Sequence, residues 1–99
     1  MCGAPAQDTD LPTGTDLARD TVLAGRVLAD GEPVGGAFVR LLDSSGEFTA
    51  EVVSSASGDF RFFAAPGSWT VRALSRIGNG ETSVQAGGPG LHHTEVAVG

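Results

Sequence analysis

Short runs of alternating apolar and polar residues begin at Thr21 and continue towards the end of the chain, separated by turns rich in glycine, serine and proline. Alternation places successive side chains on opposite faces of a strand. The turns recur roughly every 8–12 residues, and no stretch keeps a helical period over a useful length. The pattern therefore predicts an all-β protein, a β-sandwich of about seven strands.

Turn residues set the limits of the expected strands. Asp30-Gly31-Glu32-Pro33 and Asp43-Ser44-Ser45-Gly46 are typical of turns, and Ile77–Gly80 is expected to be a loop. The expected strands cover residues 21–29, 37–43, 47–54, 59–64, 68–76, 81–86 and 92–98.

The alternation also predicts which side chains share a face. In the second of these strands Phe38, Arg40 and Leu42 face one way, and Ala37, Val39 and Leu41 face the other. Core packing is expected for Phe60, Phe62 and Trp69. Phe62 and Phe63 are adjacent and must face opposite sides, so one of them is expected to be exposed, as at many protein contacts.

With 99 residues the chain is long enough for one domain and too short for two. Residues 1–20 sustain neither period and are expected to form a flexible N-terminal arm, with one turn around Asp16–Arg19. Residues 21–99 are expected to form the sandwich.

The formal net charge is −6, and all six basic residues are arginine. A negative balance argues against binding nucleic acid or an anionic membrane surface, since both need clustered Lys and Arg. No signal peptide or membrane-spanning run is visible, so the expected location is the cytoplasm. The single cysteine excludes an intramolecular disulfide.

A more specific spacing runs through about residues 21–76. It comprises Gly25-x-Val27, Asp30-Gly31-Glu32-Pro33-Val34-x-Gly36-Ala37-x-Val39-x-Leu41, Gly58-x-Phe60-x-Phe62 and Pro66-Gly67-x-Trp69-x-Val71. This spacing resembles the carboxypeptidase regulatory-like domain. The resemblance implies a prealbumin-like (transthyretin-like) Greek-key sandwich that binds or supports other molecules rather than catalysing a reaction.

A second resemblance covers nearly the whole chain. It is carried by Met1-Cys2-Gly3, by residues 35–45 and 47–53, and by Gly58-Asp59-Phe60-Arg61-Phe62-Phe63-Ala64-Ala65-Pro66-Gly67-Ser68-Trp69. These segments are similar to the actinobacterial SseC-like family, which is typically encoded beside a rhodanese-type thiosulfate sulfurtransferase. The resemblance implies an accessory role in sulfur metabolism, with that sulfurtransferase as the expected partner.

Cys2 is the first candidate for chemistry. Removal of Met1 would leave the Cys2 thiol beside the α-amino group, and a nearby positive charge favours the thiolate. A thiolate on an arm can accept a sulfane sulfur as a persulfide. The alternative is that Cys2 is an incidental residue of the tail.

Arg40, Arg61 and Arg72 each lie in the middle of an expected strand among apolar residues. If their strands are neighbours, the three guanidinium groups converge on one face and bind an anion or the carboxylates of a partner. The alternative is a solvent face on which such arginines pair with residues like Glu51 and Asp59.

His92 and His93 are adjacent, so in a strand they point to opposite faces and cannot chelate one ion together. One of them could pair with the Cys2 thiolate, and the alternative is that both are exposed on an edge strand. We expect neither a metal site nor a cofactor, because the candidate ligands have no recognised spacing.

No complete set of catalytic residues is visible, so we expect binding rather than catalysis. The leading hypothesis is an accessory protein that partners, or accepts sulfur from, a thiosulfate sulfurtransferase through Cys2. The second is a non-catalytic module that binds a protein or a small anion through Arg40, Arg61 and Arg72. The third is a true sulfurtransferase. The sequence does not give the oligomeric state.

Overall fold

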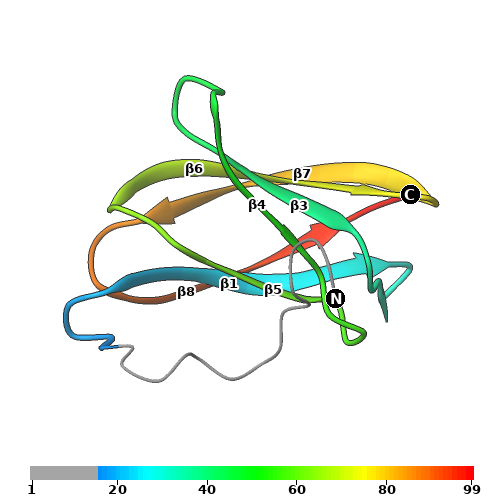
Figure 1. Ribbon diagram of the computed structural model, residues 1–99, viewed down its shortest axis with the longest axis horizontal. Coiled ribbons are helices and arrows are strands. Elements are labelled where there is room, and N and C mark those ends of the chain that lie inside the picture. The colour runs from blue at the N-terminus through cyan, green and yellow to red at the C-terminus, as the bar shows by residue number, and fades with distance from the viewer. Residues whose placement is uncertain (1–15) are drawn as a thin grey trace.

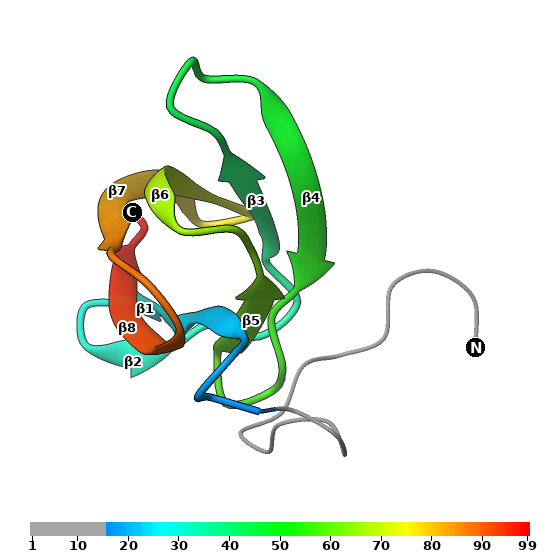
Figure 2. The same cartoon turned by 90° about the vertical axis from the view of Figure 1, so that its left-hand side faces the viewer.

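The computed structural model describes residues 16–99, and Thr21 is the first residue of its regular structure. Two four-stranded sheets pack face to face, and the chain crosses repeatedly between them (Figures 1 and 2). This confirms the predicted all-β sandwich. The strands are β1 (Thr21–Ala29), β2 (Glu32–Pro33), β3 (Phe38–Leu42), β4 (Phe48–Val53), β5 (Asp59–Phe63), β6 (Gly67–Ser75), β7 (Gly78–Ala86) and β8 (Gly90–Ala97).

The first sheet, called here the β1 sheet, is built around β1. Two hydrogen bonds of Val27 lie on the same edge of β1: the Val27 amide donates to the Gly58 carbonyl at 2.8 Å, and the Val27 carbonyl accepts from the Val34 amide. β5 and β2 therefore share one edge of β1, and β8 occupies the other. β8 runs parallel to β1, in register from Thr21 opposite Gly90 to Leu28 opposite Ala97. The first and last strands of the sandwich are therefore neighbours.

The second sheet, called the β3 sheet, has the order β4-β3-β6-β7 and is antiparallel throughout. One β-bulge interrupts the pairing of β3 with β4 between Leu41 and Leu42. Seen end-on in Figure 2, the hairpin of β3 and β4 extends beyond the rest of the sandwich.

The core lies between the sheets and is made of every second side chain of the strands. Phe60 and Phe62 of β5 fill its centre, with ring centroids 6.1 Å apart. Burying one such side chain contributes about 1.5–3 kcal/mol. The core cluster includes Leu23, Val27, Val39, Leu41, Phe60, Phe62, Val71, Ala73, Val84 and Val96, and Trp69 packs half-buried against it.

The predicted turn at residues 30–33 is too long. Its second half, Glu32–Pro33, is the short strand β2, which brings the number of strands from the predicted seven to eight. Asp30 (φ 51°) and Gly31 (φ 79°) form a two-residue turn, which is typical of tight hairpins. The chain therefore pairs back at once, with Glu32 opposite Ala29 and Pro33 opposite Leu28. A proline is tolerated there because the pairing is short and ends at that residue.

The predicted loop at Ile77–Gly80 is also wrong. The turn consists of Arg76 and Ile77, and β7 begins at Gly78. The glycines that suggested a loop instead allow two strands to approach closely. A side chain at Gly80 would overlap the carbonyl of Ala97, so β8 crosses β7 at a distance that only glycine permits.

Within residues 16–99, the structure has no helix with the length and apolar character needed to cross a membrane.

Candidate binding surface on the β3 sheet

Four charged residues form a straight row across the outer face of the β3 sheet. The register places Arg40 opposite Glu51 on one side and opposite Arg72 on the other, and Arg72 lies opposite Glu81. The row thus reads acid, base, base, acid across all four strands. The alternative interpretation of the arginines, a solvent face on which they pair with carboxylates, describes Arg40 and its partner Glu51.

Each arginine of the row is neutralised by its outer neighbour. Arg40 Nε donates to Glu51 Oε2 at 2.7 Å, and Arg72 Nη2 donates to Glu81 Oε1 at 3.1 Å. Both arginine side chains are 43% exposed. Exposed pairs of this kind contribute about 0–1 kcal/mol each. Their main effect is to let two guanidinium groups lie side by side, and an incoming anion must compete with both carboxylates.

An apolar row lies next to the charged one. Phe38 is opposite Val53 on β4 and Leu74 on β6, and the Phe38 side chain is 51% exposed at the start of β3, an inner strand of the sheet. Ile77, in the turn that follows β6, is 62% exposed. A half-exposed aromatic beside aliphatic groups, bordered by ion pairs, has the composition of a protein contact.

Arg61 does not join this surface. It lies on β5 in the β1 sheet, opposite Ala24, so the three arginines do not converge on one face. The register between strands so far apart cannot be seen in the sequence. Of the three arginines, only Arg40 and Arg72 lie on neighbouring strands. Of the two carboxylates expected as partners, Glu51 pairs with Arg40, while Asp59 pairs with Arg26 at 3.3 Å.

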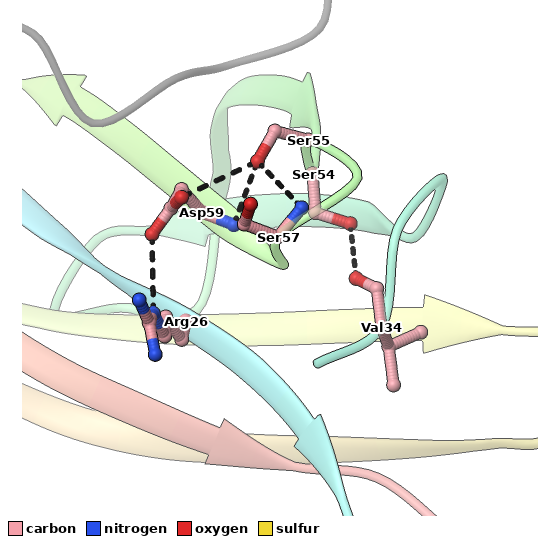
Figure 3. A network of polar contacts seen from close by, with 6 residues as sticks. All are labelled: Arg26, Val34, Ser54, Ser55, Ser57 and Asp59. Atoms are coloured by element: carbon pink, nitrogen blue, oxygen red, sulfur yellow. Dashed lines mark hydrogen bonds and ion pairs between the residues drawn. The ribbon is translucent and has the colours of Figure 1, made fainter. Parts of the chain in front are cut away.

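Asp59 and two serines form a mostly buried polar network at the turn between β4 and β5 (Figure 3). Ser55 Oγ accepts from the amides of Ser57 (3.2 Å) and Asp59 (3.1 Å). Ser54 Oγ donates to the Val34 carbonyl at 2.7 Å and accepts from the Ala37 amide at 2.9 Å. Both serines are buried, so these hydroxyls fix the turn and are not accessible nucleophiles.

The histidines lie where the alternation placed them, on opposite faces of β8. His92 is half-buried, and its Nε2 lies 2.8 Å from the Gly88 carbonyl. His93 is exposed. No group of three or more potential metal ligands occurs among residues 16–99. Cys2, and any pairing of it with a histidine, lies outside the described residues.

Phe62 and Phe63 also point to opposite faces, as predicted. Phe62 is in the core, whereas Phe63 is 50% exposed on the outer face of the β1 sheet. The sequence interpretation missed the exposure of Phe38 and Ile77. The exposure of Phe38 could have been inferred from the sequence, because alternation places it on the same face as the charged Arg40. The exposure of Ile77 could not, because the predicted loop at residues 77–80 hid the two-residue turn in which Ile77 lies.

Residues 2–98 match the model of a family described as a protein of unknown function, DUF1416. The chain belongs to this family. Two uncharacterized proteins of Mycobacterium tuberculosis H37Rv are each 63% identical to this DUF1416 protein over 99 residues, covering 99% of both chains. An uncharacterized protein of Mycolicibacterium smegmatis is 63% identical over 89 residues, covering 89% of this chain and 99% of its own.

Solved structures with the same fold have little sequence identity to it. Catechol 1,2-dioxygenase from Pseudomonas arvilla C-1 has a TM-score of 0.63 at 13% identity, over 97% of this chain and 58% of that one. A DUF3823 family protein from Parabacteroides merdae has a TM-score of 0.59 at 17% identity, over 81% of this chain and 46% of that one. The dioxygenase domain of a Streptomyces fusion protein has a TM-score of 0.59 at 12% identity, over 98% of this chain and 94% of that one.

This DUF1416 chain thus spans about half the length of the first two solved structures. At these identities the likeness shows the β-sandwich fold and nothing about activity.

Proposed function

We propose that this DUF1416 protein is a binding module without catalysis of its own, and that it holds a partner protein on the outer face of the β3 sheet. The single observation that carries the proposal is the half-exposed Phe38, which lies at the start of an inner strand of that sheet, between Val53 and Leu74. Aromatic side chains are enriched at the buried centres of protein contacts, where a few residues supply most of the binding energy.

The neighbouring charged row supports a protein rather than a small anion as the ligand. Arg40 and Arg72 already have carboxylate partners, so a small anion gains little by displacing them. A protein surface can instead extend the row with its own charges while it covers Phe38. In this arrangement Phe38 provides affinity and the ion pairs provide orientation.

The proposed partner is a rhodanese-type sulfurtransferase in the cytoplasm. The SseC-like resemblance of the segments at residues 1–3, 35–45 and 47–53 supports this choice. Two of these segments include all of β3 and all of β4, which contribute Phe38 and Glu51 to the candidate surface.

A binding measurement with matched variants tests the proposal. Phe38→Ser should weaken binding of the purified sulfurtransferase, measured by calorimetry, by about tenfold or more, since truncating an anchor side chain costs over ~1.4 kcal/mol. The control is Phe63→Ser, which removes an equally exposed phenylalanine from the other sheet. Unchanged affinity of Phe38→Ser would show that this face is not the contact, and a sulfurtransferase that does not bind the wild type would exclude it as the partner.

A second candidate function is that of a sulfur acceptor, in which Cys2 is the reacting residue. It is favoured because Cys2 is the single cysteine of the sequence and belongs to the segment Met1-Cys2-Gly3 that carries the SseC-like resemblance. The Cys2 thiolate would attack the outer sulfur of the enzyme's persulfide, and the enzyme's thiolate would leave, so that Cys2 carries the persulfide. Mass spectrometry after incubation with a persulfidated sulfurtransferase should show one added sulfur on Cys2. If Cys2→Ser supports the sulfur pathway as well as the wild type, the acceptor role is wrong.

A further inference from the structure

A hollow of about 500 Å³ lies at the end of the β3 sheet, next to the surface that carries Phe38. One wall is the segment between β2 and β3, and the other is the end of β6 with the turn before β7. The hollow is lined by Val34, Gly35, Gly36, Ser75, Arg76 and Ile77.

Both walls are held in place by contacts behind them. Ser75 Oγ donates to the Gly78 carbonyl at 2.7 Å and braces the two-residue turn of Arg76 and Ile77. On the other side, a Cβ on Gly35 would come within 2.9 Å of the Ser55 carbonyl oxygen, so this wall packs tightly on the turn after β4. The hollow is therefore preformed, and a ligand would lose little affinity to ordering it.

The lining combines one cation with apolar groups. Arg76 is the only charged residue among the described residues of the lining, and its side chain makes no hydrogen bond or ion pair within residues 16–99. This distinguishes Arg76 from Arg40 and Arg72, which have carboxylate partners. Beside it, Ile77 is 62% exposed and Val34 is half-buried.

We propose that this hollow takes a segment of the partner protein in which a carboxylate stands next to a large aliphatic side chain. The carboxylate binds the forked guanidinium of Arg76, and the aliphatic group packs on Ile77 and Val34. The ligand is a single carboxylate on an apolar carrier and not a polyanion, because the chain as a whole has a formal net charge of −6 and repels dense negative charge. The inference rests on the proposed function and names the chemistry of the partner.

Nuclear magnetic resonance with two short peptides tests this site. The probe is acetyl-Leu-Asp-Leu-amide, and its matched control is acetyl-Leu-Asn-Leu-amide, which differs only in the charge of the central side chain. Titration of the aspartate peptide into the ¹⁵N-labelled protein should shift the amides of Gly35, Gly36 and Ile77 in a saturable way. The asparagine peptide should bind about fivefold more weakly, as expected for loss of one partly exposed charged contact.

Two variants and a control assign the contacts. Arg76→Gln should lower the affinity for the aspartate peptide about fivefold and remove the preference over asparagine. Ile77→Ser should weaken both peptides alike. Arg19→Gln, which removes another exposed arginine from a position before β1, should change neither. Because the substituted side chains are exposed, the thermal unfolding midpoint should stay within a degree or two of the wild type.

The inference is overturned if neither peptide shifts these amides, if both bind equally well, or if Arg76→Gln binds like the wild type. Failure here is separate from failure of the proposed function, which is judged by the effect of Phe38→Ser on sulfurtransferase binding. If the partner's affinity depends on Phe38 but is unaffected by Arg76→Gln, the outer face of the β3 sheet remains the proposed contact surface, and the hollow is excluded as part of it.

Discussion

Asp43 organises the hairpin between β3 and β4 through a single oxygen. Its Oδ1 accepts from Ser45 Oγ at 2.6 Å and from the amides of Glu47 at 3.0 Å and Ser45 at 2.9 Å. The hydrogen bond from the Ser45 hydroxyl, followed by that from the Glu47 amide, lowers the pKa of Asp43 below its usual value.

A pH-dependent effect on stability follows for Asp43→Asn. A carboxyl group whose pKa is lower in the folded state stabilises the protein at pH values above its unfolded pKa, and this contribution is lost as the pH falls through the folded pKa. The variant should therefore have a lower unfolding midpoint at neutral pH, and the difference should vanish well below the ordinary Asp pKa of about 3.9. The control is Asp30→Asn, whose carboxylate accepts no hydrogen bond within residues 16–99. A difference that persists in acid would contradict the assigned cause.

For single residues, the sequence predicts which side chains share a face of a strand better than it predicts which residues of other strands they contact. Alternation alone placed Phe38 and Arg40 on one face and separated His92 from His93, because successive side chains of a strand must diverge. It could not place Arg72 opposite Arg40, since that pairing depends on the register between β3 and β6, two strands joined through the other sheet. The match of Arg26 with Asp59 was missed for the same reason.

At the scale of the strands, the glycines explain most of the differences between prediction and structure. β1 begins and ends where the alternation predicted, whereas β7 begins three residues earlier than expected, at Gly78 instead of Glu81. A glycine in a turn and a glycine at a strand crossing look the same in one sequence. Only the packing of β8 on β7 shows that Gly80 serves the second purpose.

Gly25 permits the close approach of β8 to β1 and should not tolerate a side chain. A Cβ there would overlap the Thr94 carbonyl and come within 2.9 Å of the Phe60 ring. Gly25→Ala should therefore lower the free energy of unfolding by about 2 kcal/mol or more, measured by urea denaturation. Gly87→Ala is the matched control, because a Cβ on Gly87 has no neighbour within 4 Å. Its effect should stay within about 0.5 kcal/mol, and equal losses in the two variants would refute the argument.

At the scale of the whole molecule, the sandwich depends on strands from the two ends of the described chain. Removal of residues 88–99 would leave β1 without its parallel neighbour and the core without Val96 and Val98. The shortened chain should lose cooperative thermal unfolding and the dispersion of its amide resonances, because a domain this small has little stability to spare. A cooperative transition in the shortened chain would contradict this dependence.

The all-β class and the two-sheet architecture were predictable, because they follow from strand length, alternation and turn spacing. The parallel pairing of β1 with β8 was not, since nothing in a local pattern says which distant strands become neighbours. The candidate surface was predictable in part: alternation places Phe38 and Arg40 on one face, whereas the hollow beside Arg76 exists only once the β2–β3 segment and the β6–β7 turn are brought together.

The pairing of β1 with β8 has a consequence for how the protein is made. During synthesis, β1 leaves the ribosome long before residues 90–97 exist, so one of its edges has no native neighbour throughout that interval. An unpaired strand edge accepts any strand of suitable geometry. In a cell that translates many copies at once, β8 of one newly made molecule can therefore occupy the vacant edge of another, and exchanged dimers are the misassembly that this topology invites.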